Sequence, residues 1–188
     1  MRNRLLAITG PTCGGKTTLK ERLLEGREDL FRGVTTTTTR RPRIGEKDGS
    51  DYRFVTEAQF RRLISEEELL EWVLVDSNYY GIERRCVAEA CLGRMHGVIV
   101  VNPSALEPIE EWCNDNRVKL VRVFASAPLD ELRRRLAKRK AIAEESEILQ
   151  RSARLEIEAR DWQRSVSYDL YAGINHNEAV QQALRAIL

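Results

Sequence analysis

The chain has 188 residues, of which 42% are hydrophobic and 32% charged, and its formal net charge is only +2. This length suits one domain with its own core, and the near-neutral charge excludes a surface that is basic all over and suited to nucleic acid. No apolar run approaches the roughly 18 residues of a membrane span, and the run at 5–8 is too short for a signal peptide. We therefore expect a cytoplasmic protein without nucleic-acid or membrane partners.

Hydrophobic periodicity predicts strands that alternate with helices along the whole chain. In the first half we expect a strand at 5–8, a helix at 17–25, a strand entering an exposed loop over 32–51, a helix at 57–64 and a strand at 69–75. In the second half we expect helices at 83–92, 104–114, 128–140, 144–164 and 177–188, with strands at 98–101, 118–124 and 168–174. Such alternation predicts an α/β fold with a parallel sheet covered by helices on both faces.

A glycine-rich loop follows the first strand. The segment GPTCGGKT, residues 10–17, satisfies the pattern G-x-x-x-x-G-K-[ST] between a strand and a helix. Its glycines let backbone N–H groups turn inward around a phosphate, and the helix N-terminus adds partial positive charge. We expect Lys16 to reach the β- and γ-phosphates of ATP and the Thr17 hydroxyl to ligate Mg²⁺. The expected ATP-binding residues are Gly10, Pro11, Thr12, Cys13, Gly14, Gly15, Lys16, Thr17 and Thr18.

Cysteine and histidine spacing predicts no metal site. The four cysteines contain no C-x-x-C pair, and His96 and His176 do not lie near them in a zinc pattern. Reduced thiols are expected, and we interpret Cys13, inside the phosphate loop, as a tolerated small residue rather than a redox switch.

A second basic segment offers a candidate site for a second anion. Arg40 and Arg43 flank Pro42, and two guanidinium groups on a stiff loop can clamp one phosphate bidentately. Taken alone, the stretch Arg-Arg-Pro-Arg is more typical of a solvated basic loop.

The residues around it resemble the signature of guanylate kinases, T-T-R-x-P-R-x-G-E-x-x-G-x-D-Y-x-F-V. The matching residues are Thr38, Thr39, Arg40, Pro42, Arg43, Gly45, Glu46, Gly49, Asp51, Tyr52, Phe54 and Val55. Similarity continues at 70–72, 78–81, 132–139 and 168–175, so it covers nearly the whole chain. It implies a P-loop nucleoside monophosphate kinase fold, with a core at 1–32, 83–134 and 165–188, a nucleotide-monophosphate-binding lobe at 33–82 and a lid at 135–164.

The resemblance also implies an activity and a set of residues. The activity is ATP-dependent transfer to a nucleoside monophosphate, GMP or dGMP, by a monomer or homodimer with Mg²⁺. Arg40, Arg43, Tyr52 and Tyr80 would hold the acceptor phosphate. Glu71 would accept hydrogen bonds from the N1–H and amino group of guanine, and Thr36 would offer its hydroxyl to the base. The implied catalytic residues are Lys16, Arg40 and the lid arginines Arg135, Arg139 and Arg151.

Two stretches depart from the family pattern. Ile82, in the acceptor site, stands where the family usually has serine or threonine, and residues 101–104, Val-Asn-Pro-Ser, lack the usual Asp-x-Asp pair. Ribose bisphosphate phosphokinases, of the same superfamily, have a similar Val-Asn-x-Ser stretch but not the Arg-x-Pro-Arg-x-Gly-Glu segment. A modified deoxynucleoside monophosphate, as viruses of bacteria use, or a ribose phosphate is therefore an alternative acceptor. A catalytically silent interaction domain and a nucleic-acid-binding protein are weaker alternatives, because Lys16 and Thr17 are both present and the net charge is small.

Overall fold

The computed structural model describes residues 2–139, 145–173 and 175–187. Its centre is a five-stranded sheet in the order β2-β7-β1-β8-β9, in which every pair is parallel. The strands are β1 (Arg4–Thr9), β2 (Phe31–Gly33), β7 (His96–Val100), β8 (Lys119–Ala125) and β9 (Leu170–Ala172). The parallel sheet predicted from the alternation of strands and helices is thus confirmed.

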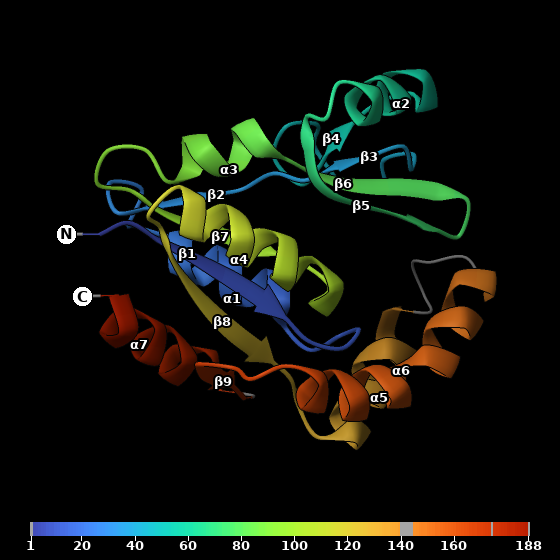
Figure 1. Cartoon of the computed structure of the whole chain (residues 1–188). Helices are drawn as coiled ribbons and strands as arrows, with labels where there is room; N and C mark the ends of the chain where they lie inside the picture. The colour runs from blue at the N-terminus through green and yellow to red at the C-terminus, as the bar shows by residue number, and fades with distance from the viewer. Residues whose placement is uncertain (1, 140–144, 174, 188) are drawn as a thin grey trace.

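Helices cover both faces of this sheet because the apolar side chains of β1 alternate between them. Leu5 and Ala7 pack in one cluster with residues of α3 (Arg84–Ala90) and α4 (Leu106–Asp115). Leu6 and Ile8 pack in another with residues of α1 (Lys16–Leu24) and α7 (His176–Ile187). All four of these β1 side chains are fully buried. Figure 1 shows the resulting three layers on the left of the view.

A second, four-stranded sheet lies beside the first and has the order β4-β3-β6-β5. Its strands are β3 (Thr37–Thr38), β4 (Arg53–Phe54), β5 (Leu69–Val75) and β6 (Asn78–Glu83). β3 pairs with β4 in parallel and with β6 antiparallel, and β5 and β6 form an antiparallel hairpin. Helix α2 (Glu57–Ser65) begins with a capping box between Thr56 and Gln59 and packs Phe60 and Leu63 with Leu69.

Several boundaries differ from the sequence predictions. The strand at 78–83 was not predicted, because its residues are mostly polar and it is held by pairing with β5 across a turn at Asp76 and Ser77. Both turn residues have positive φ, 49° and 62°, as a two-residue hairpin turn requires. The helix predicted at 83–92 therefore starts at Arg84. The helix predicted from Ser104 begins as a 3₁₀ turn, η1 (Pro103–Ala105), before α4.

Two helices after β8 form a separate packing unit. Leu132 and Leu136 of α5 (Leu129–Arg139) are buried with Leu155 of α6 (Glu145–Ser165). Figure 1 shows this pair at the lower right, on the side of the molecule to which the second sheet also extends. In the described part of the chain, no helix is both long and apolar enough to cross a bilayer.

Candidate active site

The loop between β1 and α1 has a backbone that only glycine permits at two points. A Cβ atom at Gly10 would lie 1.9 Å from the carbonyl oxygen of Ala125, and one at Gly14 would lie 2.5 Å from the same oxygen. Gly10 and Gly15 have φ values of 141° and 93°, in the region that glycine favours. Gly15 is also the N-cap of α1. The end of β8 and the start of α1 therefore shape this loop, and the helix N-terminus borders it.

Lys16 and Thr17 lie at the start of α1, where they could contact a phosphate bound in the loop. The Lys16 ammonium donates hydrogen bonds to the carbonyl oxygens of Gly10 at 2.7 Å and Pro11 at 2.9 Å. Thr17 and Thr18 are exposed in the first turn of the helix. Cys13 has a positive φ of 62° and is half-buried. The sequence-predicted phosphate-binding residues thus form a loop and the first turn of the helix that follows it.

The donor set fits Mg²⁺ bound jointly by protein and nucleotide. Within residues 2–139, 145–173 and 175–187, no group of three His, Cys, Asp or Glu side chains is placed to hold a metal. Mg²⁺ is usually held by one or two protein oxygens together with phosphates and water. The exposed Thr17 hydroxyl beside the loop can supply such an oxygen.

Helices α5 and α6 each contact the phosphate loop. Arg135 of α5 donates to the carbonyl of Cys13 at 3.2 Å and to Glu131 at 2.7 Å. Glu158 of α6 accepts a hydrogen bond from the backbone N–H of Thr12 at 2.7 Å. Glu158 was not predicted, because α6 carries several acidic residues and the sequence does not mark the one that faces the loop. Of the other predicted lid arginines, the side chains of Arg139 and Arg151 lie outside the described part of the structure.

The two arginines of the predicted second anion site share one carboxylate. The Arg40 guanidinium donates to both oxygens of Glu46, at 2.9 and 3.0 Å. Glu46 also accepts from the backbone N–H of Arg43 at 2.8 Å, and the Arg43 guanidinium lies 4.0 Å away. Burial alone would raise the pKa of Glu46, but the bonds from Arg40 and Arg43 outweigh it and lower the pKa. Glu46 therefore stays ionised and holds Arg40 in place, a role its signature match did not predict.

Two tyrosines lie beside Arg40. The rings of Tyr52 and Tyr80 meet edge to face with centroids 6.2 Å apart, and the Arg40 guanidinium lies 5.4 Å from the Tyr52 ring centre. Burial raises the pKa of the Tyr52 hydroxyl, so it remains a neutral hydrogen-bond donor. The structure thus brings Arg40, Tyr52 and Tyr80 together, with Arg43 beside them. Three guanidinium or hydroxyl groups that converge in this way suit a phosphate.

The residues expected to contact the base lie around β5 and β6. Glu71 and Ile82 are directly paired across these strands, so their side chains share one face. Ile82 is 3% exposed and packs into the core, whereas the Glu71 carboxylate accepts from the Ser104 hydroxyl at 3.3 Å. Burial raises the pKa of Glu71, and the Ser104 bond only partly opposes this. Thr36 is half-buried at the start of the same sheet.

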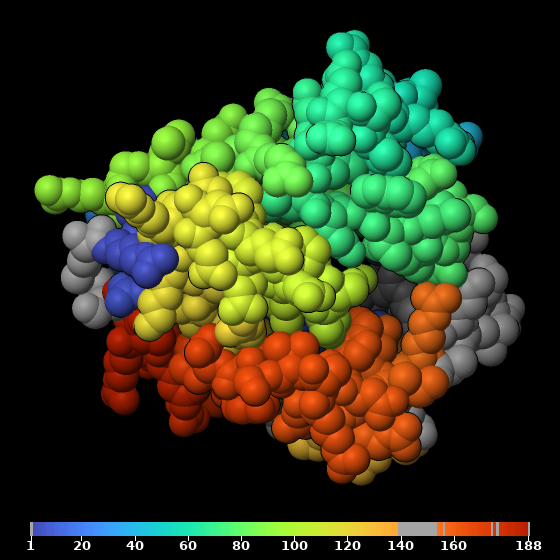
Figure 2. Space-filling model, in the orientation of Figure 1, coloured from blue at the N-terminus to red at the C-terminus, as the bar shows by residue number. Residues whose placement is uncertain are grey.

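Helix α6 also reaches the second sheet. Arg154 donates to Asp76, in the β5–β6 turn, at 3.0 Å. Arg154 and Glu158 are four residues apart and so lie on one face of α6. This face touches the phosphate loop and the hairpin at once, and Figure 2 shows the orange surface of α6 against the green surface of the hairpin.

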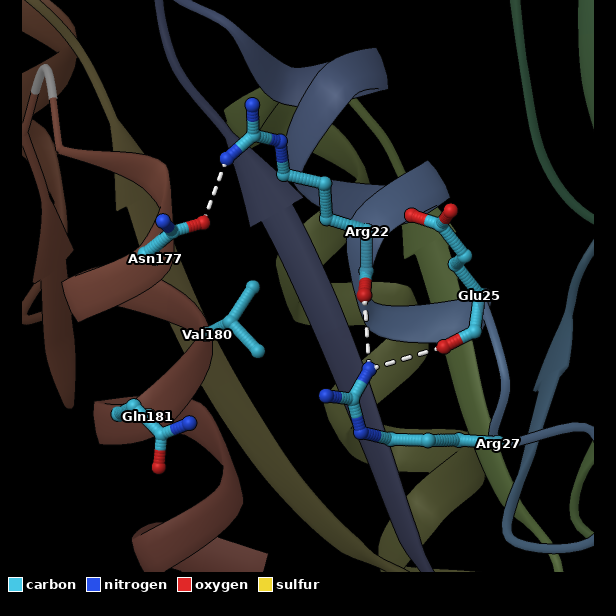
Figure 3. Close-up of a pocket in the computed structure, with 6 residues that line it drawn as sticks. All are labelled: Arg22, Glu25, Arg27, Asn177, Val180 and Gln181. Atoms are coloured by element: carbon cyan, nitrogen blue, oxygen red, sulfur yellow. Dashed lines mark hydrogen bonds between the residues drawn. The ribbon is translucent and has the colours of Figure 1, made fainter.

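A cavity of about 430 Å³ lies elsewhere, between α1 and α7 (Figure 3). It is lined by Arg22, Glu25, Arg27, Asn177, Val180 and Gln181. Arg22 donates to Asn177 at 2.6 Å, and Arg27 donates to the carbonyls of Arg22 and Glu25 at 2.9 and 3.1 Å. Because its arginines bind the protein's own oxygens and it is remote from the phosphate loop, we assign it no part in the reaction.

Comparison with known proteins supports one family over the whole chain. The guanylate kinase family model matches residues 2–187. A guanylate kinase from Synechococcus is 35% identical over 192 residues, which cover 100% of this chain and 82% of that protein. One from Ehrlichia canis is 37% identical over 182 residues, covering 95% of this chain and 82% of that protein.

Solved structures agree on the fold. A guanylate kinase from Anaplasma phagocytophilum superposes with a TM-score of 0.62 at 23% identity, covering 99% of this chain and 84% of that one. An APS kinase from Mycobacterium tuberculosis, solved with AMPPNP and APS, gives a TM-score of 0.52 at 14% identity and covers 98% of this chain and 96% of that one.

Proposed function

The chain belongs to the guanylate kinase family of nucleoside monophosphate kinases, and we propose that it transfers the γ-phosphoryl group of ATP to GMP or dGMP. The observation that supports this most directly is the convergence of Arg40, Tyr52 and Tyr80 beside Arg43. A P-loop alone is common to many nucleotide-binding proteins, whereas a kinase also needs a second phosphate site. This cluster, on a different sheet from the P-loop, has the chemistry of such a site.

In this proposal the chain contributes alignment and positive charge, not covalent chemistry. The loop 10–18 binds ATP, and Lys16 neutralises charge that develops on the transferred group. When bound, Mg²⁺ held through Thr17 would offset further phosphate charge. Arg40, Arg43, Tyr52 and Tyr80 hold the acceptor phosphate in line with the donor.

The base pocket is assigned to Glu71 and Thr36. A deprotonated carboxylate is a two-point acceptor for the N1–H and amino group of guanine, a donor edge that adenine, cytosine and uracil do not present. Ile82 shares the face of Glu71, but its apolar side chain is buried in the core there. This apolar residue beside Glu71, where the family usually has serine or threonine, is the observation that favours a second candidate, the same transfer to a modified deoxynucleoside monophosphate.

We also infer three functional parts: a core at 1–32, 83–134 and 165–188, an acceptor lobe at 33–82 and a lid at 135–164. Arg135, with Arg139 and Arg151, is assigned to the lid. Closure of the lid over ATP would exclude water and suppress hydrolysis. The contacts of α6 with Thr12 and Asp76 support this assignment, because they join the lid to both substrate regions.

A coupled assay of ADP release across a panel of monophosphates tests the proposal. The panel contains GMP, dGMP, AMP, CMP, UMP, a modified deoxynucleotide and a ribose phosphate. We expect turnover with GMP and dGMP. Turnover with only a modified deoxynucleotide would support the second candidate, and no turnover with any acceptor would refute the assignment of transfer.

Arg43→Ala is expected to raise the KM for the acceptor far more than the KM for ATP. The guanidinium is assigned to the acceptor phosphate, and losing one charged hydrogen-bond partner should cost roughly 1.5–3 kcal/mol. Arg41→Ala is the matched control, since Arg41 is exposed on the same loop. Initial-rate measurements with each substrate varied in turn separate the two constants. If the ATP constant moves instead, the two phosphate sites have been exchanged.

The KM for GMP should also depend on pH through Glu71. Burial raises its pKa above the usual 4.5. Because only the carboxylate accepts both guanine hydrogen bonds, affinity is complete above this raised pKa and is lost as the pH falls through it. The ratio of KM values for wild type and Glu71→Gln, measured at each pH, cancels the titration of GMP itself. A ratio that does not change with pH would contradict the role of Glu71.

A further inference from the structure

One carboxylate behind the acceptor site is completely buried. Glu83, the last residue of β6, is 0% exposed. Its two oxygens accept from the Arg53 guanidinium at 2.7 and 2.6 Å, and one of them accepts from Arg85 at 3.0 Å. The Thr37 hydroxyl donates to the same carboxylate. A buried charge without partners is strongly destabilising, so Glu83 needs these donors, and we call the four residues the Glu83 unit.

The register of the sheet places this unit on the face opposite the substrate residues. Thr37 pairs with both Arg53 and Gly81, so these three positions share one face of the sheet. Glu83 lies two residues after Gly81 on β6 and is therefore on the same face. Successive side chains alternate, so Tyr52 and Tyr80 point to the other face. The Glu83 unit therefore lies on one face of strands β3, β4 and β6, and the side chains of Tyr52 and Tyr80 lie on the opposite face.

Few backbone hydrogen bonds hold β4 in the sheet. β3 and β4 are two residues long, and β4 is at the edge of the sheet. The backbone N–H of Arg53 donates to Thr36 at 2.9 Å, and that of Val55 donates to Thr38 at 2.9 Å. The Arg53 side chain is the additional tie between β4 and the longer strand β6, because its terminal nitrogen Nη1 contacts both oxygens of Glu83.

We propose that Glu83 and Arg53 are positioning residues for the acceptor site, holding β4, and Tyr52 with it, at a set distance from Tyr80 on β6. The inference rests on the proposed function only in that these tyrosines bind the acceptor phosphate. It does not depend on which base the acceptor carries. Arg53 acts through the backbone of β4 and not by contact with substrate, since its side chain is bound to Glu83 on the other face.

A pair of variants separates positioning from general stabilisation. Arg53 and Arg85 both bind Glu83, but Arg53 belongs to β4 and Arg85 to the core helix α3. Arg53→Gln should raise the acceptor KM about tenfold, because a small displacement of a substrate-binding group has large effects, with the ATP KM nearly unchanged. Arg85→Gln should leave both constants near wild type.

Initial rates are measured with whichever monophosphate the panel identifies as the best acceptor, so a wrong guanine assignment does not disturb the test. Equal effects of the two variants, or a fall in kcat with no rise in acceptor KM for Arg53→Gln, would overturn the proposal. If Arg53→Gln does not fold, Arg53→Lys is used, because it keeps a positive charge for Glu83 but replaces the guanidinium with an ammonium of different shape and reach. The same selective rise in acceptor KM is then expected at smaller size, and a wild-type acceptor KM would overturn the proposal.

Discussion

Lys16→Ala is expected to abolish most of the turnover while the protein stays folded. The lysine is at the start of α1 with its ammonium over the loop carbonyls of Gly10 and Pro11, so its removal leaves the buried core intact. The lost charge is one that would stabilise the transferring phosphoryl group, and such a loss costs on the order of a hundredfold or more in kcat.

The control for this variant is Lys119→Ala. Lys119 is exposed at the start of β8, at the opposite end of the sheet from the phosphate loop. Circular dichroism and thermal unfolding should show both variants folded, and only Lys16→Ala should lose turnover. A folded Lys16→Ala protein with near-normal kcat would contradict the proposal that this loop catalyses phosphoryl transfer.

Glu71→Gln is the second large effect and tests the base assignment. The amide replaces one acceptor with a donor that faces a donor of guanine, a mismatch worth roughly 2–4 kcal/mol in kcat/KM. Glu68→Gln is the matched control, because Glu68 is exposed just before the same strand. Rates with GMP and dGMP should fall only for Glu71→Gln, and acceptors that never used the carboxylate should be spared.

The wild-type panel decides how this result is interpreted. If GMP and dGMP are good substrates and Glu71→Gln cripples both, the assignment of guanine recognition holds although Ile82 replaces the usual serine or threonine. If wild type phosphorylates neither and accepts another monophosphate, the chemistry is right and the guanine assignment is wrong. Ile82 and residues 101–103 are then where specificity has changed.

The P-loop and the proximity of Arg40 to Arg43 were predictable because each depends on a short stretch of sequence. Glycines and Lys16 fall at fixed spacing between a strand and a helix, and Arg40 and Arg43 flank a proline. In the same way, runs of apolar residues predicted β1, β7 and β8, the three central strands of the parallel sheet. Such features depend on residues that are close together in the sequence, so they can be recognised from the sequence alone.

The partners of the charged residues were not predictable. Glu158 contacts Thr12, from which it is separated by 146 positions in the sequence, and Glu83 contacts Arg53 at a separation of 30. At such separations the spacing of residues in the sequence does not indicate which of them are in contact. Strand β6 was missed for a related reason, since its polar residues become a strand only through the hairpin with β5. Arginine and glutamate are so frequent in this chain that composition alone cannot select the few that pair inside it.

The order of strands in the central sheet has a consequence for the newly made chain. β1 pairs only with β7 and β8, whose residues are synthesised about 90 or more positions later, whereas β5 and β6 are joined by a two-residue turn. Local hairpins close quickly and distant parallel pairs slowly, because the long loop must be ordered first. The apolar residues Leu5–Ile8 therefore lack their strand partners until β7 and β8 have been synthesised. A ribosome-bound chain that stops before Lys119 contains the complete phosphate-binding sequence but lacks the strand whose end shapes it.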